Sequence, residues 1–217
     1  MRIETPTAQP AALRAADDPH AVVELAFALR GESIALDHGY LFLAALAPQL
    51  PGLHGGGLPW QVLPVRGRQV APGRLELGRG ARLGIRLPVA DIAQALALAG
   101  KSLRIGEDLV VLGTPQIHAL HAAPTLVSRF VTIKGFTEAE PFREAFLRQL
   151  VDLAGGDHGT LEVGERRVMR VAEHTIVGFR VWLRELADEA SLRVQAYGLG
   201  GRRRMGAGSF LREGRRP

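Results

Sequence analysis

Residues 128–153 read SRFVTIKGFTEAEPFREAFLRQLVDL and contain a clear change of hydrophobic period. Residues 128–136 are rich in β-branched and aromatic side chains, which predicts a strand. From residue 138 the apolar residues recur at helical spacing, and acidic residues fill the first turn, where they favour the helix dipole. The stretch therefore predicts a β-strand followed by an amphipathic helix over 138–153.

The sequence on either side of residues 128–153 predicts further strands and helices. On the C-terminal side the pattern predicts strands at 160–163, 166–171 and 175–183, a helix at 187–197 and a last strand at 209–212. On the N-terminal side it predicts a strand at 22–30, a helix at 37–50, short strands within 60–88, a helix at 91–99, a hairpin at 102–112 and a loop at 114–125. Asp37 is expected to cap the first helix, which Pro48 and Pro51 end.

The order of elements in both halves is close to β-α-β-β-α-β. We therefore expect an α+β protein made of two tandem ferredoxin-like (RRM-like) βαββαβ domains, one over residues 21–115 and one over residues 125–213. Residues 1–20 carry acids and prolines without a continuous apolar run, so they are expected to form a disordered leader.

The composition excludes several classes of protein. The chain has 217 residues, 47% of them hydrophobic and 23% charged, which is typical of a globular protein. No apolar run approaches the length that spans a bilayer, so no integral membrane protein is expected. The sequence holds no cysteine, which excludes disulfides, thiolate zinc sites and thiol catalysis. The reducing cytoplasm is the expected location.

Positive charge is concentrated at the C-terminus. The chain has 27 Lys and Arg against 22 Asp and Glu, and residues 201–217 hold six arginines and one acid, Glu213. Arginine suits bidentate contacts with phosphate, so this concentration indicates a polyanionic partner. A solubilising tail in a protein of arginine-rich composition is the alternative.

The most unusual segment, residues 198–210, reads GLGGRRRMGAGSF. Glycine permits positive φ and close backbone approach, so such a run can present several N–H groups to one phosphate while arginines add charge. We therefore predict a loop that binds a nucleic-acid backbone, or, alternatively, an ordinary loop with a helix C-cap at its first glycine. A nucleotide cofactor is not expected, because the Walker and dinucleotide-binding patterns are absent. The candidate RNA-binding residues here are Gly198, Gly200, Gly201, Gly206, Gly208, Arg202, Arg203 and Arg204.

This loop resembles the C-terminal glycine-rich signature of the RAMP superfamily, and in particular of the CRISPR repeat-processing endoribonucleases of the Cas6 type. The stretches at 35–56 (ALDHGYLFLAALAPQLPGLHGG), 126–142 (LVSRFVTIKGFTEAEPF) and 175–183 (TIVGFRVWL) are similar to the myxobacterial-type subtype of that family. The resemblance covers residues 22–212 and implies two ferredoxin-like domains.

The resemblance implies a metal-independent endoribonuclease that cleaves precursor CRISPR RNA within the repeat. The enzyme is then expected to keep the mature crRNA and to join other subunits of a CRISPR interference complex. A non-catalytic RAMP-type RNA-binding subunit of such a complex is one alternative, and an RNA-binding protein unrelated to CRISPR is another.

Cleavage without metal requires a base for the 2′-hydroxyl and an acid for the 5′-oxygen, and histidine suits both roles. In the family that the chain resembles, the histidine commonly stands at or just after the end of the first helix, which matches His54. Some members use residues nearer the start of that helix, so His38 and Tyr40 are second candidates. His118 and His121 form an HxxH pattern without a third ligand, so we expect no metal site.

Two residues of the strand that opens the second half, Arg129 and Lys134, are further candidates for RNA contacts. Aromatic residues make up only 6% of the chain, so recognition through arginine and the RNA backbone is favoured over a broad stacking surface. No lysine occurs in residues 1–100, where family members often carry one near the histidine. Arg66, Arg68 or an arginine of the loop could then stabilise the phosphorane.

Overall fold

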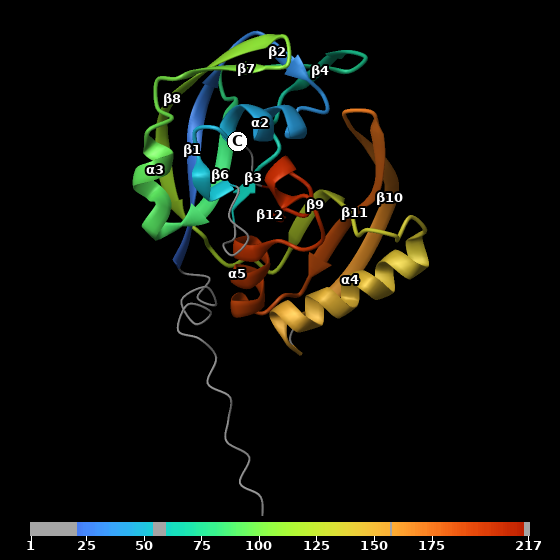
Figure 1. Ribbon diagram of the computed structural model, residues 1–217. Coiled ribbons are helices and arrows are strands. Elements are labelled where there is room, and N and C mark those ends of the chain that lie inside the picture. The colour runs from blue at the N-terminus through green and yellow to red at the C-terminus, as the bar shows by residue number, and fades with distance from the viewer. Residues whose placement is uncertain (1–20, 54–59, 157, 215–217) are drawn as a thin grey trace, which may run out of the picture.

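Each half of the chain builds one antiparallel sheet that two helices cover on one face. The computed structural model describes residues 21–53, 60–156 and 158–214, and Figure 1 shows the two halves side by side, the first in blue to green and the second in yellow to red. The first half contains β1 (Val22–Arg30), β2 (Ser33–Ala35), α2 (Gly39–Leu46), η2 (Pro51–Leu53), β3 (Gln61–Val62), β4 (Arg68–Ala71), β5 (Arg74–Glu76), β6 (Arg82–Pro88), η3 (Val89–Asp91), α3 (Ile92–Leu96), β7 (Ser102–Ile105) and β8 (Asp108–Ala119). The second half contains β9 (Leu126–Val131), α4 (Ala139–Ala154), β10 (Thr160–Val171), β11 (His174–Arg184), α5 (Asp188–Tyr197), η4 (Arg203–Met205) and β12 (Leu211–Arg212).

The first sheet has the strand order β3-β6-β1-β8-β7. Alternate residues of β1, namely Leu25, Phe27 and Leu29, are buried in one core with Phe42 of α2 and Ala95 of α3. This alternation is what a strand with one face on the core requires. A smaller sheet, β2-β5-β4, lies beside it in the same half of the chain.

The second sheet has the order β10-β11-β9-β12, with α4 and α5 packed on it. Four phenylalanines fix the packing, because the rings of Phe142 and Phe179 lie 4.6 Å apart and Phe146 contacts both Phe142 and Phe210. Aromatic rings at such distances add to the energy of burial. The second core is therefore built on aromatic contacts between α4 and the sheet.

The two sheets share one topology. In each sheet, four strands can be numbered 1 to 4 in chain order: β1, β3, β6 and β8 in the first sheet, and β9, β10, β11 and β12 in the second. With this numbering both sheets have the spatial order 2-3-1-4, and a helix follows the first and the third strand. This is the ferredoxin-like arrangement. The predicted α+β class with two tandem ferredoxin-like domains is confirmed.

Several predicted boundaries are wrong. The loop expected at 114–125 is mostly strand, since β8 continues to Ala119 by pairing with β1. The strands at 160–163 and 166–171 are one strand, β10, which stays paired with β11 across a β-bulge between Val163 and Arg166. Asp37 makes no side-chain cap and instead accepts a hydrogen bond from the backbone N–H of Arg170 at 3.1 Å, so His38 takes the N-cap position. None of the described helices is long and apolar enough to cross a membrane.

The two halves are joined through buried polar groups at the C-terminal end of α5. Arg86 of β6 is fully buried, pairs with Glu24 of β1 at 3.2 Å, and donates Nη1 to the carbonyls of Gln195 and Phe210, each at 2.7 Å. Gln61 of β3 donates Nε2 to the carbonyls of Gln195 and Ala196. Positive charge is favourable at a helix C-terminus. The first sheet therefore caps a helix of the second domain.

Replacing Arg86 by methionine is expected to destabilise the protein by about 3–5 kcal/mol, because the change leaves the buried Glu24 carboxylate and the α5 carbonyls without the guanidinium. Denaturant unfolding of the full chain measures this loss. The control is Arg68→Ala, which removes an exposed pair with Glu76 and should cost no more than about 1 kcal/mol. Equal losses for the two variants would contradict the role given to Arg86.

Candidate nucleic-acid interface

The glycine-rich segment between α5 and β12 folds as a tight loop that only glycine permits. Gly198, Gly200, Gly206 and Gly208 all have positive φ, between +63° and +82°. A Cβ atom at Gly208 would lie 2.1 Å from the carbonyl oxygen of Leu199. The loop therefore needs glycine both for its backbone angles and for close approach between its two ends.

The backbone N–H groups of all five candidate glycines are already used inside the protein. Gly200 donates to Oε1 of Gln149 at 3.0 Å, Gly201 donates to the carbonyl of Thr132, and Gly208 donates to the carbonyl of Phe130. The remaining two, Gly198 and Gly206, bond to the carbonyls of Val194 and Arg203. The expectation that these N–H groups cradle a phosphate is therefore wrong in this conformation. The glycines shape the loop.

The loop lies between the two domains. Gly39, the first residue of α2, approaches the backbone of Met205 so closely that a Cβ atom would lie 2.0 Å from the Met205 carbonyl oxygen. Figure 1 shows this red segment next to α2. The hydrogen bonds to Thr132 and Phe130 hold the other side of the loop on β9. The loop therefore connects the start of α2 with the strand that opens the second domain.

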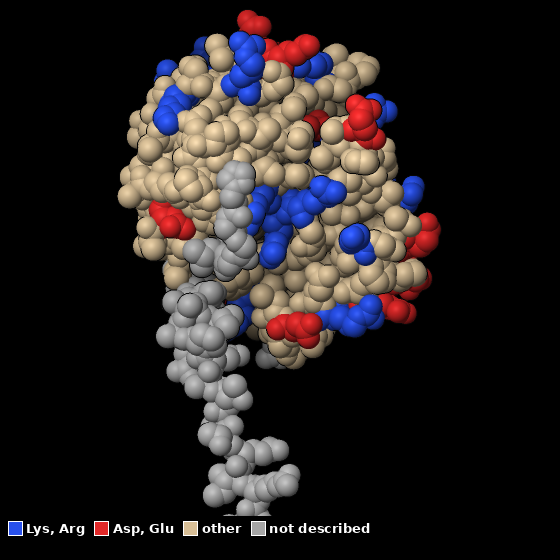
Figure 2. Space-filling view, in the orientation of Figure 1, with Lys and Arg blue, Asp and Glu red and all other residues tan. Residues whose placement is uncertain are grey.

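The arginines of the loop differ in their surroundings. Arg202 and Arg203 are exposed and Arg204 is partly buried. Arg203 donates Nη1 to the carbonyl of Tyr197 at 2.6 Å, and its pKa is lowered by partial desolvation of the guanidinium and then by the neighbouring Arg204. Figure 2 shows Lys and Arg side chains gathered near the middle of this face, where Figure 1 places the red C-terminal loop.

Lys134 lies close to the loop but not in the strand where it was predicted. Strand β9 ends at Val131, and Lys134 is exposed in the turn that the hydrogen bond from Phe136 N–H to the Ile133 carbonyl closes. Thr132, two residues earlier, accepts the hydrogen bond from Gly201. The turn therefore places a lysine next to the base of the glycine-rich loop.

A cluster of four arginines contains one residue of the first domain and three of the second. Arg129 of β9 is exposed, and its pKa is lowered first by partial desolvation and then by Arg167 of β10, Arg66 of the first domain and Arg180 of β11. Glu165 offsets part of this charge, since it pairs with Arg167 and lies 3.8 Å from Arg180. Like charges that repel one another favour the binding of an anionic ligand.

The sequence pointed to Arg129 and Arg66 but missed Arg167 and Arg180. The strand period puts Arg180 and Trp182 on one face, where the guanidinium lies 4.2 Å from the ring centroid. The bulges in β10 and β9, which decide what lies opposite Arg129, leave no signal in the sequence.

His38 is buried, with both ring nitrogens engaged. Nε2 accepts a hydrogen bond from the backbone N–H of Val65, and Nδ1 bonds to the carbonyl of Ala35, both at 3.0 Å. Because a backbone N–H is only a donor, Nε2 carries no proton and Nδ1 carries it. Burial lowers the pKa of His38, although the Ala35 carbonyl acts in the opposite direction. In this arrangement His38 holds the segment that leads to Arg66 and has no nitrogen left for proton transfer.

The other two catalytic candidates are Tyr40 and His54. Tyr40 is 38% exposed on α2, two residues after His38. His54 lies outside the described residues, and the residues before and after its segment are well packed: Leu53 and Trp60 are buried, and Trp60 donates Nε1 to Asp91 at 3.1 Å. Within the described part of the chain, no three His, Cys, Asp or Glu side chains are grouped so as to hold a metal ion.

Stability is expected to fall as the pH is lowered through the range in which His38 titrates. The folded state favours the neutral imidazole, so the stabilisation is present above the pKa of the unfolded state and is lost as the pH falls toward the lower folded-state pKa. Unfolding of the wild type and His38→Gln between pH 7.5 and 5 should show a smaller pH dependence for the variant. His174→Gln, at an exposed position, is the control and should behave like the wild type.

Comparisons with known proteins agree with this architecture. The family model described as Cas6 Crispr matches residues 23–214. The CRISPR-associated endonuclease Cas6 of Myxococcus xanthus (strain DK1622) is 40% identical over 193 residues, which cover 89% of this chain and 82% of that protein.

Two solved structures have a similar fold. A CRISPR associated protein Cas6 has a TM-score of 0.64 at 13% identity, and a RAMP protein binding different RNA substrates has a TM-score of 0.59 at 14% identity. Each comparison covers 88% of this chain and 98% of the other. The resemblance inferred from residues 22–212 is confirmed, and the chain belongs to the Cas6 family.

Proposed function

We propose that this protein is a metal-independent endoribonuclease that cleaves precursor CRISPR RNA within the repeat to generate mature crRNA. Support comes from its membership of the Cas6 family and from its 40% identity to a protein named CRISPR-associated endonuclease Cas6. In this proposal the protein keeps the crRNA and joins other subunits of an interference complex.

The observation that carries the proposal is the arginine cluster between the domains. Arg66 comes from the first domain and Arg129, Arg167 and Arg180 come from the second, and the pKa of Arg129 is lowered by partial desolvation and then by repulsion from the other three. A phosphate backbone that runs between the domains relieves this repulsion by neutralising the guanidinium groups. The arginines at 202–204 and Lys134 extend the positive surface on the side of the glycine-rich loop.

The cleavage step needs no oxidant, metal or cofactor. A base removes the proton of a ribose 2′-hydroxyl, whose oxygen attacks the adjacent phosphorus while the bond from phosphorus to the 5′-oxygen breaks. An acid gives a proton to that leaving oxygen. The products are a 2′,3′-cyclic phosphate and a 5′-hydroxyl. Arginines of the cluster or the loop stabilise the extra negative charge on the phosphorane.

We assign the proton transfer to His54 and a positioning role to His38. Both ring nitrogens of His38 are hydrogen-bonded to backbone groups, which supports a structural task at the start of α2. Tyr40, exposed on the same helix, is the candidate for orienting the reacting phosphate.

A non-catalytic RAMP-type subunit that binds guide RNA is the second candidate function. The engagement of His38 favours it, because one of the two histidines expected to take part in the chemistry is held by Ala35 and Val65. The two candidates predict the same RNA binding and differ only in whether the bound repeat is cut.

In excess EDTA, the protein should cleave the labelled repeat RNA of its source genome, and His54→Ala should lower the single-turnover rate by about 10²–10⁴-fold. The dissociation constant for the repeat should stay unchanged, since the imidazole acts on the proton and not on affinity. A single 2′-deoxy nucleotide before the scissile phosphate should block cleavage by the wild type.

His174→Ala, at an exposed position, is the matched control and should cleave at the wild-type rate. Tight binding without any cleavage by the wild type would favour the non-catalytic subunit. Unchanged cleavage by His54→Ala would remove His54 from the mechanism.

Replacing Arg129 by alanine should weaken binding of every RNA to a similar degree and reduce the slope of log affinity against log salt concentration by about one. The reason is the loss of one phosphate contact. Filter binding at four salt concentrations measures both quantities. Arg143→Ala, at an exposed position on α4, is the control of equal charge change. An equal effect of the two variants would contradict a phosphate site at Arg129.

A further inference from the structure

The open face of the second sheet, which is the face away from α4 and α5, carries an arginine and a tryptophan. In β11 every second residue, Phe179, Val181 and Leu183, is buried in the core with those helices. Successive side chains of a strand point to opposite faces, so Arg180 and Trp182 lie on the open face. Both side chains are partly buried. The open face therefore presents a planar cation and a large aromatic ring next to each other.

A bulge in β10 makes room for the ring of Trp182. Between Val163 and Arg166 the register of β10 with β11 shifts, and Gly164 stands inside that shift. A Cβ atom at Gly164 would lie 2.5 Å from Cζ3 and 3.2 Å from Cη2 of the tryptophan. Gly164 does not have a positive φ, so its backbone angles alone do not demand glycine. Glycine is needed here for space, because the indole ring lies against the backbone of β10.

The guanidinium of Arg180 lies over this ring. Its Cζ is 4.2 Å from the ring centroid of Trp182, which is the distance of a cation–π contact. Nε of Arg180 is buried and has no hydrogen-bond partner among the described residues, and the ion pair of Nη1 with Glu165 is long, at 3.8 Å. The ring therefore sets the position of the guanidinium, while 35% of the arginine side chain stays exposed. Guanidinium planes stack on bases as aromatic rings do, so Arg180 offers a surface that is already in place.

Arg129 and Phe130 lie across from Arg180 on the neighbouring strand. In the register of β11 with β9, Arg180 falls opposite the bulge that holds these two residues. A Cβ atom at Gly178 would lie 2.7 Å from Cζ of Phe130, so this ring covers the open face two residues before Arg180. RRM domains stack bases on aromatic side chains of a four-stranded sheet. A nucleotide whose phosphate binds at the exposed Arg129 can therefore place its base on Arg180.

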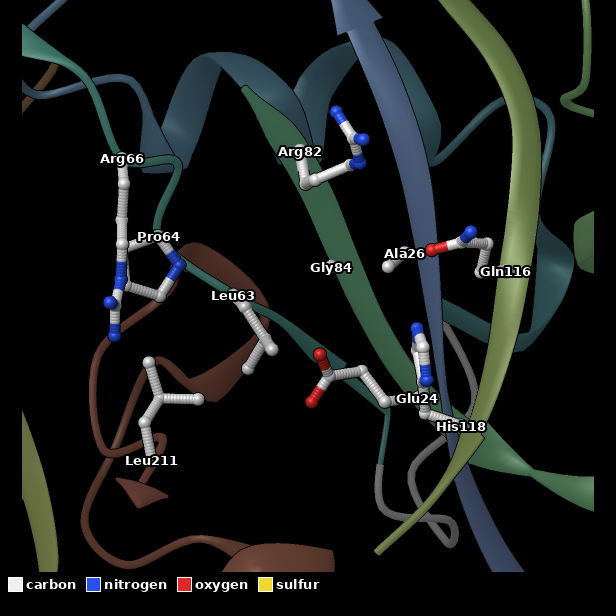
Figure 3. Close-up of a pocket in the computed structure, with 10 residues that line it drawn as sticks. All are labelled: Glu24, Ala26, Leu63, Pro64, Arg66, Arg82, Gly84, Gln116, His118 and Leu211. Atoms are coloured by element: carbon white, nitrogen blue, oxygen red, sulfur yellow. The ribbon is translucent and has the colours of Figure 1, made fainter. Parts of the chain in front are cut away.

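Arg66 brings a positive charge of the first domain to the edge of the open face. Figure 3 shows its side chain extending from beside Pro64 toward Leu211 of the second domain, and all three line one pocket of about 270 Å³. Leu211 pairs with Val127, which in turn pairs with Trp182, so these residues form a row across the sheet. An RNA backbone can therefore reach the open face beside a cationic group of the other domain.

We propose that Arg180 and Trp182 form a stacking site for one unpaired base of the bound RNA. The base lies on the guanidinium, which the indole ring supports, and the phosphate of the same nucleotide binds at Arg129. Because every base has a π-face, the site accepts any of the four bases. The inference rests on the proposed function for its RNA ligand, and it gives Arg180 a task, base stacking, that differs from the phosphate contact of Arg129.

The test compares two fluorescent ligands with the full-length protein, a uridine decamer and an abasic RNA of the same length. Arg180→Lys keeps the charge but has no planar surface. It should weaken binding of the uridine decamer about tenfold, as the loss of one stacked base allows, and leave the affinity for the abasic RNA unchanged. The slope of log affinity against log salt concentration should stay as in the wild type, because the number of charges is the same.

Arg184→Lys is the matched control, because Arg184 lies on the same face of β11 and is paired with Glu162 and Glu213. This variant should bind both ligands like the wild type. Trp182→Leu should lose the preference for the uridine decamer, since the guanidinium then has no ring beneath it. Trp182→Phe should keep most of the preference, because a phenyl ring still supports the guanidinium.

An equal loss of affinity for both ligands in Arg180→Lys would make Arg180 a phosphate contact and overturn the proposal. Equal binding of the two ligands by the wild type, or no binding of either, would also overturn it. Cleavage of the repeat RNA in EDTA is assayed separately, and its absence would count against the proposed function. The two decamers decide the stacking site whether or not the repeat is cut.

Discussion

The buried guanidinium of Arg86 is the interaction on which the relation of the two domains depends. It stands on β6 of the first sheet, is balanced by Glu24 of the same sheet, and donates to carbonyls at the end of α5 and at Phe210 in the second domain. A charge buried this far from water is tolerated only when it is paired and hydrogen-bonded. The two sheets must therefore keep one relative position, because separation would take the carbonyls of Gln195 and Phe210 away from the buried guanidinium.

That fixed position determines where the glycine-rich loop goes. The loop starts where α5 ends, and the polar groups of Arg86 and Gln61 hold that end against the first sheet. The loop then lies against α2 at Gly39, and the N–H groups of Gly208 and Gly201 donate to Phe130 of β9 and to Thr132, the residue after that strand. Its glycines are therefore a structural requirement of the domain junction, and the arginines they carry are placed by that junction. Under the proposed function, recognition of the RNA phosphates is left to side chains from both domains.

The sequence predicted what depends on local periodicity and missed what depends on distant partners. The alternation of apolar residues in β1 and β11 and their helical spacing in α4 were sufficient to predict the two ferredoxin-like domains. Each of these patterns indicates an element with one buried face. The role of Asp37 was wrong because its partner, the N–H of Arg170, lies in the other domain. The glycine N–H groups were assigned to phosphate because the accepting carbonyls of Phe130 and Thr132 are about 70 residues earlier in the chain. Neither partner is visible from composition or spacing.

The same reasoning separates the histidines by their surroundings. A general acid or base needs a ring nitrogen that can reach the substrate, whereas a histidine that accepts from one backbone group and donates to another keeps a single tautomer. His38 is of the second kind, because its Nε2 accepts a hydrogen bond from Val65. Val65 directly precedes Arg66. Among the described residues, Arg66 is the only arginine of the first domain that contributes to the lowered pKa of Arg129. A structural histidine thus holds the segment that leads to Arg66. Under the proposed function, the proton chemistry and the electrostatics then reside on different residues, and a substitution that alters one should leave the other unchanged.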